Sequence, residues 1–239
     1  MKNHLVVFDI DGTLIRAARL GRNLQRFRHA ILTVFGKDIG VVTEELWKER
    51  NYNGKGDRLI LWDMVRPLGI ARDLFLDRLG ELGAALVSYL EMIQEDGPSY
   101  EVIPDAQTML KKVIAAPHLS LGVLTGNLGA PAIWKLRATG IPEIAFGVYG
   151  HEADERNDLA RLLIPKATQY FGHEIRAEEI VIVGDTVHDV RCAKAIGARS
   201  IVVLTGWNVS RTDVEKENPT LLVDSLLDQR VLELLGLNQ

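Results

Sequence analysis

The sequence predicts an α/β protein, in which a parallel sheet with helices on both faces is interrupted after its first strand by an inserted α-helical cap domain. Two observations lead to this fold class. From residue 104 onward, short apolar runs alternate with helical segments, which is typical of a parallel sheet with right-handed crossovers. Between residues 16 and 96 there is only helical spacing, with no run typical of a strand. We therefore expect a core of residues 1–15 and 98–239 and a cap of residues 16–97.

The first predicted strand ends in an unusual pair of aspartates. The apolar run Leu5–Phe8 has the composition of a short strand buried on both faces of a sheet. Asp9 and Asp11 follow it, and Gly12 then allows the chain to turn sharply. A turn can use one aspartate, whereas two carboxylates this close repel each other. The pair is therefore the first candidate for a functional role.

The cap is predicted to consist of helices. Apolar residues recur at intervals of three and four between Phe75 and Ile93, which indicates one face of a helix. The polar loop 51–57, which contains Lys55, is interpreted as a solvated turn rather than a substrate contact. Two prolines between residues 96 and 104 end the helical region. Helical spacing is also found earlier, near residues 20–35, 44–49 and 57–65.

The second half of the chain supplies the remaining strands. Helical segments separate its apolar runs, and one of these segments contains Pro165, which either starts a new helix or kinks an existing one. Four runs are expected to form buried strands and a short fifth run to add an edge strand: Leu119–Thr125, Ile144–Tyr149, Ile180–Asp185, Ser200–Thr205 and Thr220–Val223.

The composition excludes several classes of protein. The 239 residues are 47% hydrophobic and 25% charged, as in an ordinary globular protein. A formal net charge of −4 without a basic block argues against nucleic acid as a partner. Cys192 is the single cysteine, so there is no intramolecular disulfide and no four-thiolate zinc site. Neither a signal peptide nor a membrane-spanning run is evident, so we expect a cytoplasmic protein without membrane contacts. The oligomeric state is left open.

Polar residues follow three of the predicted strands: Asp9 with Asp11, the turn Thr125–Asn127, and Asp185 with Asp189. Ligands of an open parallel sheet bind at the carboxyl ends of its strands, so these groups are expected to converge. Three carboxylates in one place favour a cation, and oxygen ligands favour Mg²⁺.

The turn at residues 125–127 suits a phosphoryl group, because a helix is expected to begin near Gly129 and its N-terminus favours an anion. Taken singly, Thr125 and Asn127 are also typical of a turn or a helix cap. The nucleophile could be a metal-activated water or an aspartate held against the metal.

At this point the sequence resembles the haloacid dehalogenase superfamily, in its phosphatase branch with a helical cap. "DIDGTL" at Asp9–Leu14 is similar to the first motif of that family, "LTGN" to the second, and "VGDTVHDVRCAKAIGA" at Val183–Ala198 to the fourth. The continuation to "VLTGW" is similar to phosphoglycolate-phosphatase-like members. The resemblance implies a Rossmann-like core, whereas the cap matches only in its position and helical character.

The resemblance also implies roles for single residues. Asp9 would be the nucleophile that forms an aspartyl-phosphate, and Asp11 would protonate the leaving oxygen and then activate water. Thr125, with Gly126 and Asn127, would hold phosphate oxygens. The metal would be bound by the Asp9 carboxylate, the Asp11 backbone carbonyl and Asp185, with Asp189 orienting these groups from behind.

The third motif departs from the family pattern, which normally provides a lysine before the helix that precedes the fourth motif. Arg156 stands where the chain leaves the apolar run 144–149, so we assign it as the cation that neutralises phosphate and nucleophile. Lys166, which follows Pro165, is the second candidate and a possible phosphate contact, and Arg161 is the third.

The expected function is that of a Mg²⁺-dependent phosphatase. Its substrate would be a small phosphorylated metabolite, phosphoglycolate-like or a sugar phosphate. Two alternatives remain open: a phosphomutase of the same superfamily, and a non-catalytic phosphate-binding regulatory protein. The substrate and the cap residues that select it do not follow from the sequence.

Overall fold

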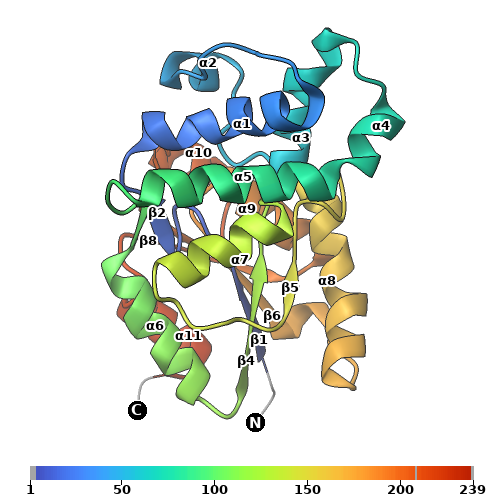
Figure 1. Ribbon diagram of the computed structural model, residues 1–239. Coiled ribbons are helices and arrows are strands. Elements are labelled where there is room, and N and C mark those ends of the chain that lie inside the picture. Colours follow the sequence, from blue (N-terminus) through green and yellow to red (C-terminus); the bar gives the residue numbers. More distant parts are fainter. Residues whose placement is uncertain (1–3, 208, 238–239) are drawn as a thin grey trace.

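The computed structural model describes residues 4–207 and 209–237, and its core is a six-stranded parallel sheet (Figure 1). The strands lie in the order β5-β4-β1-β6-β7-β8, so β1 is central and the chain leaves it toward both edges. Each of the central pairs is in register over four or five residues. This confirms the predicted α/β class. The strands are β1 His4–Phe8, β4 Leu119–Leu124, β5 Gly147–Val148, β6 Ile180–Gly184, β7 Arg199–Val203 and β8 Leu221–Val223.

Helices cover both faces of this sheet because alternate residues of β1 point to opposite sides. Val6 and Phe8 pack in one apolar cluster with α6 (Pro104–Ala115), α7 (Gly129–Ala138) and α11 (Gln229–Leu235). Leu5 and Val7 pack in another with α8 (Arg156–Phe171) and α9 (Val187–Ile196). The second half of the chain also contains two shorter elements, the 3₁₀ helix η2 (Ala177–Glu179) and the helix α10 (Arg211–Lys216).

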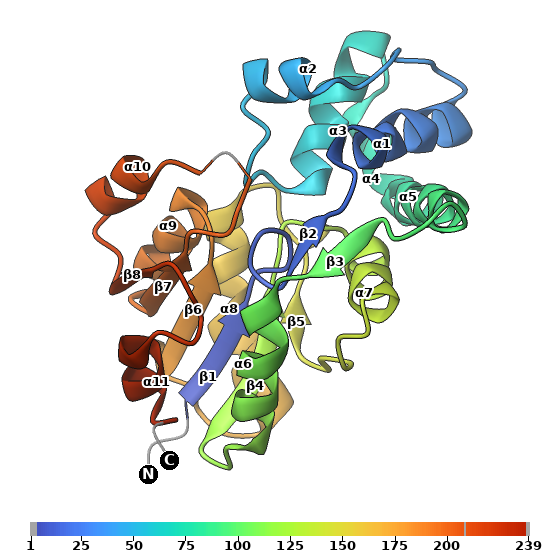
Figure 2. The same cartoon turned by 90° about the vertical axis from the view of Figure 1, so that its left-hand side faces the viewer.

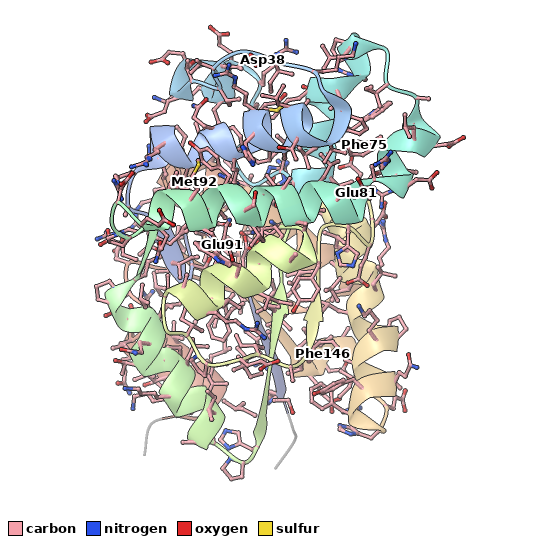
Figure 3. All side chains as sticks on the ribbon, viewed as in Figure 1. Asp38, Phe75, Glu81, Glu91, Met92 and Phe146 are labelled. Carbon is pink, nitrogen blue, oxygen red and sulfur yellow. The ribbon has the colours of Figure 1, made fainter. Side chains whose placement is uncertain are left out.

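The cap has a hydrophobic core of its own, around Phe27, Trp47, Phe75 and Leu86. Phe75 in the cap and Phe146 beside the sheet lie in separate parts of the molecule (Figure 3). None of the described helices is long and apolar enough to cross a membrane. The cap elements are α1 Leu20–Phe35, α2 Glu44–Glu49, α3 Asp57–Val65, η1 Arg66–Leu68, α4 Arg72–Asp77 and α5 Leu79–Gln94.

Core and cap are joined by a two-stranded antiparallel ribbon, in which β2 (Ile15–Ala17) pairs with β3 (Tyr100–Val102). Figure 2 shows this ribbon between the sheet and the cap helices. The expectation that residues 16–96 contain no strand is therefore wrong at its start, because β2 reaches Ala17. Strands of three residues that pair across the insertion leave no periodicity in the sequence. We keep the division into residues 1–15 with 98–239 and residues 16–97 as a proposal about domains.

Three further expectations are corrected in detail. The helical face from Phe75 to Ile93 belongs to two helices, which meet at Arg78, and the break lets Phe75 pack against Trp62 with ring centroids 5.3 Å apart. The run 144–149 pairs only at Gly147–Val148, since it forms the edge of the sheet. Pro165 starts no helix and lies inside α8.

Gly122 of β4 packs so tightly against neighbouring side chains that a larger residue there should destabilise the protein. A Cβ atom at Gly122 would lie 2.6 Å from Phe146 Cδ1 and 3.0 Å from Val7 Cγ1. The Phe146 ring cannot move freely, because it packs against Tyr170 and Phe171. We expect Gly122→Ala to lower the free energy of unfolding by about 1–3 kcal/mol in urea titrations.

The matched control is Gly80→Ala in α5, where an added Cβ meets no atom within 4 Å. This variant should be neutral or slightly stabilising, because alanine is the better helix former. Equal urea midpoints for the two variants would contradict the close packing at Gly122.

Candidate active site

The carboxyl ends of the three central strands bring the predicted site residues together. Asp9 follows β1 and is held by its backbone, whose N–H donates to the Val183 carbonyl at 2.8 Å. Thr125 follows β4 and Asp185 follows β6. Asp9, Asp11, Gly126, Asn127, Arg156 and Asp185 all line one pocket between core and cap.

Gly12 is required by this convergence. Its φ of +85° lies in the left-handed region, and a Cβ there would lie 2.2 Å from Asp185 Oδ2. The tight turn after Asp11 therefore both strains any L side chain and closes against a site carboxylate. Glycine in the "DIDGTL" run is explained by this approach.

Three buried carboxylates form the centre of the site. Asp9, Asp185 and Asp189 each offer an oxygen within 4.8 Å of the others. Burial, followed by repulsion from Asp189 and Asp9, raises the pKa of Asp185 well above its ordinary value. Burial also raises the pKa of Asp9 to about 6, although Arg156 opposes this shift. Such a cluster is unfavourable without positive charge, so its oxygen ligands fit a hard divalent cation.

Both carboxylate oxygens of Asp189 accept hydrogen bonds from the protein. Oδ1 accepts from Arg156 Nη2 at 2.6 Å, and Oδ2 accepts from the backbone N–H and the hydroxyl of Thr186 at 2.9 and 2.8 Å. The Asp185 N–H also donates to Oδ2, at 3.2 Å. Because Thr186 and Asp189 form a capping box at the start of α9, the helix itself fixes this carboxylate. Asp189 thus holds Arg156 and the Asp185 backbone in place.

Arg156 is the first residue of α8 and contacts Asp9 directly. Its Nη2 donates to Asp9 Oδ2 at 3.2 Å as well as to Asp189, and its side chain is 8% exposed. The buried thiol of Cys192 donates to the Arg156 carbonyl, which anchors this end of the helix. A guanidinium between two carboxylates leaves further N–H groups for an anion in the pocket.

Lys166 and Arg161, the other two candidates for the third-motif cation, do not contact Asp9. Lys166 lies farther along α8, where it pairs with Glu152 and donates to the Gly147 carbonyl. Arg161 is exposed and pairs with Asp158 on the same helix. A continuous α8 through Pro165 directs both away from the carboxylate cluster.

Sequence reasoning missed Lys135, which is fully buried on α7. Its Nζ donates to Asp11 Oδ2 at 2.7 Å and to Asn127 Oδ1 at 2.6 Å. Burial would raise the pKa of Asp11, but Lys135, followed by the charge of Arg26 and the Asn127 hydrogen bond, outweighs it, so the pKa lies below its ordinary value. The sequence signal that could have revealed it is helical spacing: Lys135 lies three residues after Ala132 and next to Leu136, and therefore on the face of α7 that packs against the core.

The cap loop 51–57 is part of the site, which corrects its interpretation as a solvated turn. Lys55 lines the pocket together with Tyr52 and Gly54. The Asp57 N–H donates to the Gly126 carbonyl at 2.7 Å, and the Asp57 carboxylate accepts from the Leu128 N–H at 3.1 Å. These bonds place the loop directly against the turn that follows β4.

Comparisons with known proteins agree with this geometry. A family model described as HAD-hydrolase-like matches residues 157–229. Phosphoglycolate phosphatase 1 of Pseudomonas aeruginosa is 27% identical over 229 residues, which cover 94% of this chain and 77% of that protein. The chain is therefore similar to members of the haloacid dehalogenase superfamily. Within the superfamily it is similar to the phosphoglycolate-phosphatase-like branch, so the resemblance seen in the motifs is confirmed.

Two further comparisons extend the similarity over nearly the whole chain. The tyrosine-protein kinase PtkA of Mycobacterium tuberculosis is 27% identical over 235 residues, covering 97% of this chain and 72% of that protein. The crystal structure of CbbY from Rhodobacter sphaeroides in complex with phosphate has a TM-score of 0.71 at 20% identity. It covers 99% of this chain and 100% of that one, which shows that the fold is shared from end to end.

The carboxylate cluster predicts how stability depends on pH. A carboxyl whose pKa is raised by folding binds its proton more tightly in the folded state, so the free energy of unfolding falls as the pH rises above about 4. We expect Asp185→Asn to increase the stability of the metal-free protein at pH 8 by at least about 1 kcal/mol and to flatten its pH dependence.

Denaturant unfolding in chelator between pH 5 and pH 8 measures both effects. The control is Asp77→Asn at an exposed position of α4, which should leave the pH dependence of the wild type unchanged. A wild-type protein that becomes more stable toward pH 8 in chelator would contradict the repulsion at Asp185.

Proposed function

We propose that the protein is a Mg²⁺-dependent phosphatase that hydrolyses a small phosphomonoester, phosphoglycolate-like or a sugar phosphate, through an aspartyl-phosphate at Asp9. The observation that supports this most is the contact of Arg156 with Asp9 inside the cluster of buried carboxylates. A carboxylate that faces both a cation and a pocket can attack phosphorus, while the cation offsets the charge that builds up. We further propose that it acts in the cytoplasm.

The donor set fits magnesium. Asp9, Asp185 and the Asp11 backbone carbonyl would hold the ion, and Asp189 is already saturated by Arg156 and the Thr186 region. When bound, the ion would offset the charge of the carboxylates and of the substrate phosphate. The raised pKa values of Asp9 and Asp185 support a site built to receive positive charge.

The first half of the reaction uses Asp9 and Asp11. Asp9 Oδ attacks phosphorus, a bond to phosphorus forms, and the bond to the ester oxygen breaks. Asp11 gives its proton to that oxygen, so the product leaves as an alcohol. An incoming phosphate dianion raises the pKa of a neighbouring carboxyl, which lets Asp11 take up this proton when substrate binds.

The second half reverses the role of Asp11. A water attacks the phosphorus, Asp11 takes its proton, and the bond to Asp9 breaks to give inorganic phosphate. Thr125 and Gly126 hold the phosphate oxygens during both halves, whereas Asn127, expected from the sequence to share this role, already donates both Nδ2 hydrogens, to Thr125 and Asp11. Arg156 stays paired with Asp9 and Asp189 and stabilises the transferring group.

The proposal is tested with the purified protein and a panel of phosphorylated metabolites that includes 2-phosphoglycolate and sugar phosphates. We expect Mg²⁺-dependent release of inorganic phosphate without a bisphosphate activator. Transfer of the phosphoryl group to another position of the same sugar would instead identify a phosphomutase. Binding of phosphate without turnover on any ester would identify a regulatory protein.

Asp9→Asn and the choice of metal test the nucleophile and the ion. We expect Asp9→Asn to abolish turnover without loss of stability in chelator, because the amide keeps the shape and removes repulsion within the cluster. Phosphate release assays measure this loss of turnover, and thermal unfolding in chelator measures the stability of the variant.

The metal requirement is tested on the wild-type protein. Its activity should vanish with chelator and return with Mg²⁺, whereas Ca²⁺ should support little turnover because it prefers longer and more numerous contacts. Phosphate release assays measure this dependence, and full activity in excess chelator would contradict the proposed Mg²⁺ requirement.

Arg156, Lys166 and Arg161 are compared as methionine variants. We expect Arg156→Met to lower kcat by about a hundredfold or more, as is typical when a cation facing the transferring group is removed. Lys166→Met and Arg161→Met should stay within about threefold of wild type, because Arg161 is exposed and Lys166 is paired with Glu152, so that neither contacts Asp9. A collapse of kcat in Lys166→Met alone would reassign the third motif.

A further inference from the structure

Lys135 is a charged residue in a place that packing alone does not explain. It lies between buried residues of α7, and its side chain has no exposed surface. An apolar side chain of similar length would fill this position without the cost of burying an ammonium group. The charge is therefore maintained by what it contacts.

The ammonium group has two hydrogen-bond acceptors and one aromatic ring as neighbours. Two acceptors lie at hydrogen-bond distance, Asp11 Oδ2 at 2.7 Å and Asn127 Oδ1 at 2.6 Å. On a third side, the ring of Tyr100 lies with its centroid 4.8 Å from Nζ. Lys135 thus reaches the active site from behind, through residues that themselves line the pocket.

Lysine can only donate, and this sets the direction of the next hydrogen bonds. Asn127 must turn Oδ1 toward Lys135, so its Nδ2 donates to Thr125 Oγ1 at 2.8 Å and to Asp11 Oδ2 at 2.7 Å. The Asn127 N–H also donates to Thr125 Oγ1, at 3.3 Å. With two donors directed at this oxygen, the orientation of the buried Thr125 hydroxyl is set by Asn127.

The same contacts distinguish the two oxygens of Asp11. Oδ2 accepts from both Lys135 and Asn127, whereas Oδ1 has no hydrogen-bond partner among the described residues. A proton taken up by Asp11 therefore resides on Oδ1, since Oδ2 already faces two donors. The Asp11 side chain is 42% exposed and lines the pocket, so Oδ1 can present this proton to a bound substrate.

We propose that Lys135 is a positioning residue for the phosphatase reaction, which anchors Oδ2 of Asp11 so that Oδ1 carries the proton to the leaving oxygen. Through Asn127 it also orients the Thr125 hydroxyl. This inference rests on the proposed function, in which Asp11 is the general acid. Lys135 acts through these residues and has no contact with the reacting atoms.

The test compares leaving groups. An alkoxide needs a proton to leave, whereas a nitrophenolate leaves without one, so only the first depends on a well-placed acid. We expect Lys135→Met to lower kcat/KM for an alkyl phosphate by about a hundredfold and for 2,4-dinitrophenyl phosphate by less than about fivefold. The ratio of the two values on one sample does not depend on how much of the protein is folded.

Two reference variants make the outcome specific. Arg137→Met, at an exposed position of the same helix, should change neither substrate. Asp11→Asn should show the same dependence on leaving group as Lys135→Met, and the double variant should be no worse than Asp11→Asn. Equal losses for both substrates in Lys135→Met, or additive losses in the double variant, would overturn the positioning role.

The failure of the positioning role can be told apart from failure of the proposed function. If Asp11→Asn lowers both substrates equally, Asp11 is not the acid and the proposed mechanism itself is wrong. If neither Lys135→Met nor Lys135→Gln folds, as judged by circular dichroism, Lys135 is a structural residue and the proposal fails. Retention of the wild-type ratio in Lys135→Gln, which keeps a donor without the charge, would show that the hydrogen bonds are sufficient.

Discussion

Repulsion among carboxylates at one edge of the sheet is the constraint on which the rest of this structure depends. Asp9, Asp185 and Asp189 are buried within 4.8 Å of one another, an arrangement that is stable only beside positive charge. Arg156 provides part of that charge from the first turn of α8. The packing of α8 and α9 against the sheet and the capping box of α9 serve to hold this guanidinium in place.

Two buried cations each contact a different aspartate of the site. Arg156 comes from α8 on one face of the sheet and contacts Asp9, whereas Lys135 comes from α7 on the other face and contacts Asp11. The two aspartates of one short motif have different surroundings: burial raises the pKa of Asp9 although Arg156 opposes it, whereas Lys135 outweighs burial and lowers the pKa of Asp11. Different surroundings for neighbouring carboxyl groups are how one motif can contain both a nucleophile and an acid.

The cap completes the pocket through backbone contacts as well as side chains. Gly126 and Gly56 approach so closely that a Cβ at Gly126 would lie 2.7 Å from Gly56 Cα, and Asp57 bonds to both ends of the same turn. Ion pairs of Arg58 and Arg72 with Asp154 add a second connection between cap and core. The position of the loop 51–57 over the pocket therefore depends on its contacts with the turn that follows β4.

Local signals in the sequence were sufficient for the fold class and for the aspartates. A buried strand that ends in "DIDGTL" and another that ends in "VGD" are each readable within a few residues, and parallel topology then requires their ends to meet. The position of Arg156 directly after the apolar run 144–149 also favoured it over Lys166, but only the course of α8 through Pro165 shows which cation reaches Asp9.

What only the tertiary structure decided depends on contacts between distant segments. Lys135 meets Asp11 across 124 positions of sequence, and the ribbon of β2 with β3 closes across the whole cap. The docking of the loop 51–57 on Gly126 is likewise a contact between two separate parts of the chain. No periodicity or motif encodes such pairings, because each segment alone reads as an ordinary helix face, turn or short apolar run.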